Sequence, residues 1–298
     1  MRRMRRKLFF DNYNNQLSGY LFILPQMALF LVFMVYPVFD GIVMSLYRTG
    51  LNSIRFVGLQ NYIRLFSNEL FIKATVNTIQ YVIGAGVLTV VVGLFISTAV
   101  FDKSVKYMSF VRGACYVPVM MTMVAYSIVW LWILNPAYGL VNHYISAAGG
   151  ERINFMGIIK YAKIILIVVI WLFNLGQGVI LFIAAMIGIP QTLLEAARID
   201  GASKFQSIIH IVLPLVKPTV FYVIILIFID VIKVFLAIEL MTAGGPNYAT
   251  ISLMYLCYEE AFIRYNLGNA SAIGVIMFLL SLILSLSQVK LFQIGKEE

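Results

Sequence analysis

Three charged side chains lie within the apolar run at residues 219–241, where ionised groups are costly. They are Asp230, Lys233 and Glu239. Charges at membrane depth need a partner or a water-filled cavity. Asp230 and Lys233 are three residues apart, so on a helix they share a face and could pair. Two interpretations follow: the pair borders a path for a polar substrate, or it satisfies itself and fixes the orientation of the helix. Glu239 has no local partner, which favours the path or its mouth.

A stripe of polar and aromatic residues lies within the apolar run at residues 162–189. Trp171, Asn174, Gln177 and Gly178 are at helical spacing on one side. An aromatic ring beside amides can hold a sugar, because ring faces stack and amides bond to hydroxyls. The same stripe is common in contacts between helices, and Tyr222 has the same ambiguity. The candidate substrate path thus comprises Trp171, Asn174, Gln177, Tyr222, Asp230, Lys233 and Glu239.

Nothing in the sequence indicates a catalytic or metal site. His143 and His210 are the only histidines, and neither has a cluster of cysteines or carboxylates nearby. A Gly-x-x-x-x-Gly-Lys-Ser/Thr loop is also missing from the sequence, so we expect no ATP site of the usual kind in this chain. We therefore expect no catalytic residue, no metal and no cofactor of its own.

A polar, helix-forming segment interrupts the apolar runs at residues 195–218. Thr192 precedes Glu195 by three residues, and Ser203 precedes Gln206 by three, so each pair predicts a capping box at a helix start. Gly201 lies where the first short helix should end, because glycine adopts the left-handed conformation without a steric cost. We expect two short helices joined at a glycine corner, with the second helix ending at the prolines that follow it.

The composition requires a membrane. Hydrophobic residues make up 61% of the chain and charged residues 12%, and the mean hydropathy is +0.92. Soluble domains carry about twice that charged fraction. Six apolar runs are each near or above the ~20 residues that cross a bilayer, and none alternates as a barrel strand does. The sequence predicts an all-α integral membrane protein with six transmembrane helices, at residues 20–39, 74–101, 110–134, 162–189, 219–241 and 269–292.

Lysines and arginines predict the orientation. With the N-terminus inside, the inner segments hold thirteen of them and the outer segments eight. This bias favours both termini inside, and it places the polar segment in the cytoplasm. The basic stretch at residues 1–7 is read as a topogenic signal before a retained helix, because the apolar run after it is too long for a signal peptide. The net charge of +9 is scattered over short loops, so we expect no nucleic-acid partner.

The polar segment resembles a known motif. Glu195-Ala196-Ala197, Gly201 and Ile211-x-Leu213-Pro214 have the spacing of the EAA loop of binding-protein-dependent ABC importer permeases. The resemblance implies that this segment inserts into a groove on an ATP-hydrolysing subunit; the alternative is a connector without a partner. The residues implied in coupling to the ATPase are Glu195, Ala196, Ala197, Arg198, Asp200, Gly201, Ala202, Leu213 and Pro214.

A second stretch, MTAGGPNYAT at residues 241–250, is similar to a segment of the carbohydrate-importing subfamily, with Ala243 where family members often have glycine. The Gly-Gly-Pro sequence predicts a tight turn. The resemblance implies that Gly244, Gly245, Pro246 and Asn247 contact a solute-binding protein. It extends over nearly the whole chain, because VGLQNY at residues 57–62 and the spacing of Pro25, Phe33 and Pro37 are also similar to the family pattern.

The resemblance implies a type I ABC importer permease fold with cytoplasmic EAA coupling helices, in the cytoplasmic membrane of a prokaryote. It implies a permease that moves a sugar or oligosaccharide by alternating access. The implied partners are a second, homologous permease, two ABC ATPase subunits that bind ATP and magnesium, and an extracytoplasmic solute-binding protein. We expect residues 1–73 to form a tail, first helix and outer loop, and residues 74–298 a core with the EAA loop at about 190–218.

Two other classes remain open from the residues alone. An ion-coupled secondary transporter of a polar solute would use Asp230 and Lys233 as a relay and would have no use for the polar segment. A membrane-embedded enzyme, such as a glycan-modifying transferase, would need a cluster of acids or histidines at one membrane face.

Overall fold

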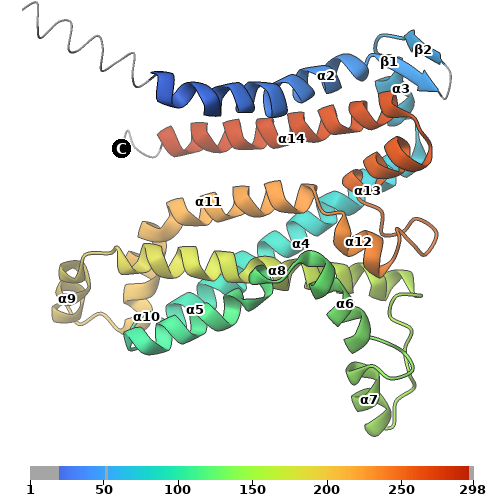
Figure 1. Cartoon of the computed structure of the whole chain (residues 1–298). Coiled ribbons are helices and arrows are strands. Elements are labelled where there is room, and N and C mark those ends of the chain that lie inside the picture. The colour runs from blue at the N-terminus through green and yellow to red at the C-terminus, as the bar shows by residue number, and fades with distance from the viewer. Residues whose placement is uncertain (1–19, 51–52, 295–298) are drawn as a thin grey trace, which may run out of the picture.

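The structure is a computed structural model that describes residues 20–50 and 53–294. The basic stretch at residues 1–7 and Lys296 lie outside the described residues. Within the described residues, five helices are long and apolar enough to cross a membrane, and the number is six if a pair of helices bent by 97° counts as one span. The long helices run side by side (Figure 1). The six-span, all-α prediction is confirmed.

The first span, Tyr20–Met44, contains the π-helical segment η1 (Leu31–Val35) and α2 (Tyr36–Met44). It leads into an antiparallel hairpin, β1 (Tyr47–Gly50) and β2 (Ser53–Phe56), and then into α3 (Gln60–Phe66). The buried Asn61 amide donates hydrogen bonds to the carbonyls of Ser45 and Tyr47, at 2.8 Å each. These bonds hold α3 against the start of the hairpin.

Two uninterrupted helices, α4 (Glu69–Val100) and α8 (Ile159–Ile187), form the centre of the bundle. Small residues allow them to approach closely. A Cβ on Gly93 would lie 3.1 Å from the Phe182 ring, and one on Gly178 would lie 2.7 Å from Thr89. The predicted spans at 74–101 and 162–189 are therefore confirmed within a few residues.

The predicted third span at 110–134 is two helices. α5 (Val105–Met120) and α6 (Met123–Ile133) meet at an angle of 97°. Pro118 removes a backbone donor near the end of α5, and Thr122 starts α6 by accepting a hydrogen bond from the Ala125 amide on its hydroxyl. Hydropathy does not distinguish such a break from a straight helix. A short helix, α7 (Leu140–Ala147), follows.

The fifth span begins earlier than the sequence predicted. α9 (Gln191–Ile199) precedes α10 (Lys204–Ser207), the π-helical segment η2 (Ile208–Val212) and α11 (Leu213–Ile232), and the last three form one helix from Lys204 to Ile232. The expectation that prolines end the second short helix is wrong. Pro214 lies inside this continuous helix, directly after η2, where the Leu213 amide bonds the Ile208 carbonyl and the i→i−4 ladder is already interrupted. The span ends at Ile232, and residues 236–241 form a separate helix, α12 (Leu236–Met241).

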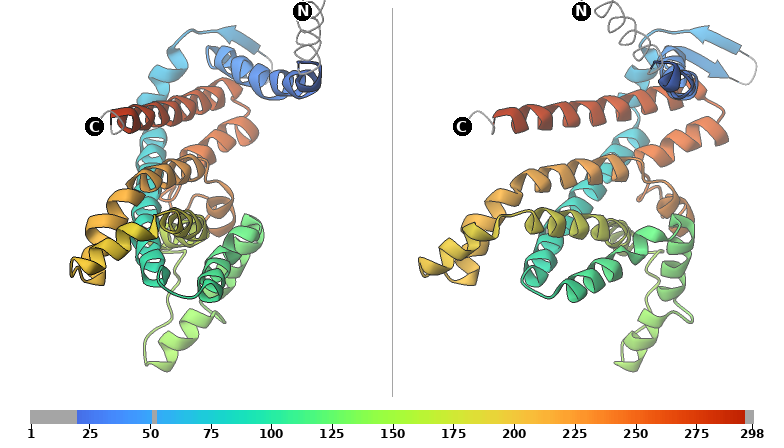
Figure 2. Two further views of the ribbon diagram at one scale, coloured as in Figure 1. Left: turned by 90° about the vertical axis from the view of Figure 1, so that its left-hand side faces the viewer. Right: turned by 60° about the vertical axis from the view of Figure 1, so that its left-hand side comes forward.

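The chain then passes through α13 (Leu253–Tyr258) and the π-helical segment η3 (Glu259–Ile263) into α14 (Leu267–Ile294). Figure 2 shows α2 and α14 together at one side of the bundle, with α6 and α7 at the other. In Figure 1, α9, the start of the first span and the end of α14 lie at one end of the molecule. The hairpin, α12 and α13 lie at the opposite end, so the polar segment and the 241–250 loop are separated by the length of the spans.

Candidate functional site

The polar segment folds as a compact corner, which we call the elbow and define as α9, the turn at residues 200–203 and α10. Gly201 has φ +81°, and its amide donates to the Arg198 carbonyl at 3.1 Å. The Ala202 amide donates to the Ala197 carbonyl at 2.9 Å. These two bonds are the Schellman pattern that ends a helix at a left-handed glycine. The predicted glycine corner is confirmed.

Of the two predicted capping boxes, one is present. The Ser203 hydroxyl accepts from the Gln206 amide, and the Gln206 side chain accepts from the Ser203 amide at 2.8 Å. The Thr192–Glu195 box is wrong, because α9 begins one residue before Thr192. Pro190 is the N-cap of that helix, and its extended backbone ends the preceding turn.

The elbow presents one face to the bundle and another away from it. Leu194 and Ala197 are buried, whereas Glu195, Ala196 and Arg198 on the same helix are exposed. Two large apolar side chains point outward: Ile199 is 86% exposed and Phe205 is 70% exposed. These two side chains are the candidates on the elbow for contact with another chain. The other predicted coupling residues lie at the corner or its exit, with Asp200, Gly201 and Pro214 exposed and Ala202 and Leu213 half-buried.

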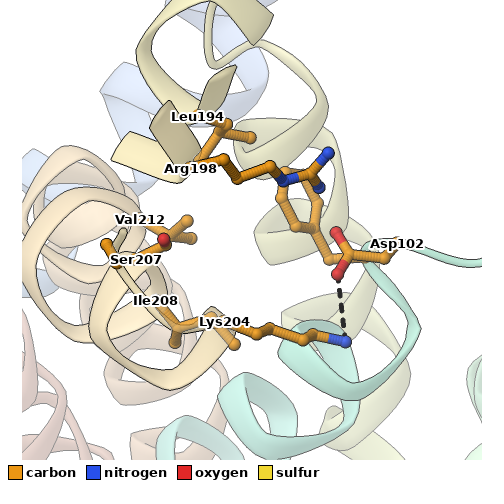
Figure 3. A pocket seen from close by; sticks show the side chains of 9 residues that line it. Asp102, Leu194, Arg198, Lys204, Ser207, Ile208 and Val212 are labelled. Carbon is orange, nitrogen blue, oxygen red and sulfur yellow. Dashed lines mark ion pairs between the residues drawn. The ribbon is translucent and has the colours of Figure 1, made fainter. Parts of the chain in front are cut away.

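A pocket of about 190 Å³ lies between the elbow and the loop that follows α4. Figure 3 shows Arg198 and Lys204 reaching into it from the elbow, toward Asp102. The Lys204 Nζ lies 3.0 Å from the Asp102 Oδ2, an ion pair between partly exposed side chains. Within the described residues, no other hydrogen bond or ion pair joins α9 or α10 to an element outside the elbow and its own helix. The sequence predicted no role for Asp102.

A larger pocket, of about 500 Å³, lies on the bundle between α8, the end of α11 and the start of α6. It brings together four of the seven predicted path residues: Asn174, Gln177, Asp230 and Lys233. Its remaining wall is mostly apolar and includes Phe173 and Phe235. We call it the polar pocket. It combines two amides, one acid, one base and aromatic rings, which together suit a ligand rich in hydroxyl groups.

Of the two interpretations of Asp230 and Lys233, the self-satisfying ion pair is not present among the described residues. They form no ion pair within 4.0 Å among the described residues, and both side chains are exposed. The reason is local: α11 ends at Ile232, and Lys233 is its C-cap rather than a residue within the helix. Both charges therefore face the polar pocket without satisfying each other.

The remaining predicted path residues lie elsewhere. Trp171 is half-buried and packs against the core. Its neighbour Ile170 lines the polar pocket, whereas Trp171 does not. Tyr222 is 50% exposed and does not line that pocket. Glu239 lies on α12 beside Tyr255, where burial, followed by the charges of Glu239 and Glu259, raises the pKa of Tyr255 to about 12.

The 241–250 loop is tight and anchored on α4. The Gly245 amide donates to the Thr242 carbonyl at 2.8 Å, and the Thr250 hydroxyl donates to the Gly245 carbonyl at 2.7 Å. The predicted turn is therefore present. Gly244 is buried and has φ +74°, whereas Asn247 is exposed. Gly245 and Pro246 are half-buried, so Asn247 is the one residue of the four candidate contacts that is fully at the surface.

An acid pair that sequence reasoning missed lies beside this loop. Glu259 and Glu260 are 7% and 5% exposed, and they share one cation, Arg264, at 2.9 and 2.7 Å. The Tyr248 hydroxyl donates to Glu259 at 3.5 Å, and Asn269 donates to Glu260 at 3.1 Å. Burial lowers the pKa of Arg264, but the two carboxylates outweigh it and raise that pKa overall. The Glu260–Arg264 spacing of four residues in an apolar stretch was the available signal.

With an elbow at one end of six spans and an anchored loop at the other, the chain has the architecture of a transport permease. The sequence model of the family "Binding-protein-dependent transport system inner membrane component" matches residues 90–293. The chain belongs to this family and is therefore a multi-pass inner-membrane protein.

Curated relatives extend the match to nearly the whole chain. The "Probable ABC transporter permease protein YurN" of Bacillus subtilis is 33% identical over 95% of this chain and 99% of that protein. The "Trehalose/maltose transport system permease protein MalF" of Thermococcus litoralis is 34% identical over 93% and 94%. The "sn-glycerol-3-phosphate transport system permease protein UgpA" of Yersinia enterocolitica is 29% identical over 91% and 92%.

Solved structures show the same fold. A chain of a bacterial alginate ABC transporter, in complex with an alginate pentasaccharide-bound periplasmic protein, has a TM-score of 0.83 at 22% identity. The match covers 94% of this chain and 95% of that chain. A second structure of a bacterial alginate importer has a TM-score of 0.84. These likenesses confirm the permease fold.

Proposed function

We propose that this chain is a permease subunit of an ATP-driven importer that moves a sugar or oligosaccharide across the cytoplasmic membrane. The elbow is the observation that carries the proposal. It is a rigid corner, closed by two backbone bonds at Gly201 and by the Ser203 capping box, and it holds Ile199 and Phe205 outward. A connector needs none of these features, whereas a docking element needs both rigidity and an exposed apolar face.

The proposed assembly has four further chains. Two ATPase subunits bind ATP and magnesium and receive the elbows, since this chain has no phosphate-binding loop. A second, homologous permease completes the path, because the polar pocket opens at the surface of this chain. A solute-binding protein docks on the opposite side, against the loop that contains Gly244, Gly245, Pro246 and Asn247. Both termini and the elbow are then cytoplasmic.

Alternating access follows from this arrangement. Closure of the two ATPase subunits draws the elbows together, and each elbow is continuous with the fifth span through η2. Rigid-body movement of the spans then closes the path on one side and opens it on the other. Glu195, Ala196, Ala197, Arg198, Asp200, Gly201, Ala202, Leu213 and Pro214 are the proposed force-transmitting residues.

The polar pocket is the proposed point of contact with the substrate. Asn174 and Gln177 offer amide donors and acceptors, and the unpaired Asp230 and Lys233 offer one charge of each sign. Neutral sugars present hydroxyl groups that can donate to the acid and accept from the base. The relatives named for trehalose and maltose, and the alginate importer, support a carbohydrate. Trp171, Tyr222 and Glu239 do not line this pocket, so nothing in the geometry supports a substrate role for them.

Two measurements test the proposal. The tagged chain, expressed with its genomic neighbours, is expected to co-purify with an ATPase subunit, and removing the elbow face by Ile199→Ser with Phe205→Ser is expected to reduce the recovered ATPase. The paired substitution Ile158→Ser with Tyr138→Ser is the control, since both side chains are exposed elsewhere. Uptake of a panel of labelled sugars then identifies the substrate.

An ion-coupled transporter is the competing function, and the same uptake assay separates the two. ATP-driven import requires ATP inside the vesicles and persists when a protonophore dissipates the proton gradient. Uptake without ATP, driven by a proton or sodium gradient, would overturn the proposal and return Asp230 and Lys233 to the role of an ion relay.

A further inference from the structure

The ends of α4 are attached to both functional regions of the molecule. At its first turns, side chains of α4 form five hydrogen bonds with residues 247–253. Lys73 donates to the Asn247 carbonyl at 2.8 Å, Asn77 donates to the carbonyls at 249 and 251, Tyr81 donates to the Thr250 carbonyl at 2.8 Å, and Thr78 accepts from the amide at 253. Most of these groups are buried, so the 241–250 loop is fixed to α4.

The other end of α4 is attached to the elbow. The helix ends at Val100, and Asp102, two residues later, forms the ion pair with Lys204 at 3.0 Å. Phe101 lines the same pocket as Leu194 of α9. The contact joins residues 102 positions apart in the sequence, so it is a tertiary link rather than part of the elbow's own fold.

Between these ends α4 is a rigid rod. It is a continuous α-helix of 32 residues without proline, about 48 Å long at 1.5 Å per residue. It packs against α8 along its length, with close contacts at Gly84 and Gly93. The covalent routes into the elbow are less regular: one passes through the turn at Gly188–Pro190, and the other through the π-helical segment η2.

We infer that α4 couples the 241–250 loop to the elbow through the Asp102–Lys204 ion pair, and that Asp102 is a positioning residue for this coupling. The inference rests on the proposed function. Coupling between distant sites requires a physical link that responds to both. Here the link has a docking loop at one end, a docking elbow at the other and a single polar contact at the elbow. A partly exposed ion pair is weak enough to break and re-form as the elbow moves, and while it is formed it links α10 to the end of α4.

The test uses the complete complex of permeases and ATPase subunits in lipid nanodiscs. Hydrogen–deuterium exchange of the 241–250 loop is measured without nucleotide and with MgATP plus orthovanadate, which closes the ATPase pair. In the unmodified complex, closure is expected to change the exchange rate of this loop. In the Asp102→Asn and Lys204→Gln variants this change is expected to be about two- to fivefold smaller, the coupling that a partly exposed ion pair provides.

Two further variants make the result specific. Exchanging the charges, with Asp102→Lys and Lys204→Asp together, is expected to restore the response, which an effect of either charge alone would not predict. Lys103→Gln removes an exposed neighbouring charge that has no ion pair within the described residues, and it is expected to leave the response unchanged. The inference is overturned if the loop does not respond in the unmodified complex, if the single variants respond fully, or if the charge exchange assembles but does not restore the response. If no ATPase co-purifies with the unmodified chain, it is the proposed function that fails.

Discussion

At the scale of single residues, the backbone conformation of Gly201 determines the angle of the elbow. Its φ of +81° suits glycine, and a Cβ added at this position would meet no atom within 4 Å, so backbone conformation rather than space limits substitution. Asparagine also tolerates the left-handed region. Substitutions of Gly201 therefore test the effect of backbone strain without adding a steric clash.

We predict that Gly201→Pro uncouples ATP hydrolysis from uptake. Proline fixes φ near −65° and removes the amide that donates to Arg198, so the corner cannot close. Gly201→Asn is the matched control and should retain most uptake, with a cost of about 1 kcal/mol or less in stability. Transport and ATPase rates of the reconstituted complex are the measurement, and normal coupling in the proline variant would contradict the role of the corner.

Arg264 compensates two buried carboxylates. We predict that Arg264→Met lowers the free energy of unfolding by about 2–3 kcal/mol, since removing one partner leaves buried charge uncompensated and the arginine is itself partly exposed. Thermal unfolding in detergent measures the loss. Arg55→Met, at an exposed position on β2, should change stability by less than about 0.5 kcal/mol. Adding Glu260→Gln to Arg264→Met should recover part of the loss; no recovery would show that the cost is not electrostatic.

At the scale of elements, the crossing of α5 and α8 depends on Gly176. A Cβ at this position would clash with the Cys115 carbonyl oxygen, so the backbones are in direct contact. We predict that Gly176→Val forces the helices apart and lowers the free energy of unfolding by about 1–3 kcal/mol or more. Gly86→Val in α4 is the control, because nothing lies within 4 Å of its Cβ position. Equal thermal stability of the two variants would contradict the close crossing.

The elements show what a sequence can and cannot predict. Gly201 and the Ser203–Gln206 pair were predictable because helix ends are local and depend on a few neighbouring residues. The bend between α5 and α6 was missed because hydropathy stays high across the break. The early start of the fifth span was missed because Pro214 was read as a terminator, although it lies inside one helix, directly after the π-helical segment that interrupts the i→i−4 ladder.

Some contacts in the candidate site could also be predicted from the sequence, and others could not. Asn174 and Gln177 are three residues apart on one helix, so helical spacing alone placed them together. Their meeting with Asp230 and Lys233 depends on how α8 and α11 pack. The Asp102–Lys204 contact joins elements that are distant in sequence, and no local pattern marks it. The interpretation of Asp230 and Lys233 as an ion pair assumed a continuous helix, and it does not hold because α11 ends at Ile232.

At the scale of the whole molecule, the elbow and the hairpin lie at opposite ends of the spans (Figure 1). We predict that a cysteine replacing Arg55 is labelled by a membrane-impermeant maleimide in intact cells, whereas one replacing Ile199 is labelled only after permeabilisation. Both positions are exposed, and Cys115 and Cys257 are first replaced by serine. Labelling of the Ile199 position in intact cells would place the elbow outside and contradict ATPase docking.

The segment η2 joins α10 to the rest of the fifth span in one helix with an offset in phase. Its five residues bond at i+5 rather than i+4, as in the Leu213 amide to the Ile208 carbonyl, which accommodates one extra residue. Deleting that residue would restore an ordinary helix and turn α10 by about 100° around the axis of the span. The same docking surface would then face a different side of the complex. The number of residues between Ser207 and Leu213 therefore determines the direction in which the elbow faces.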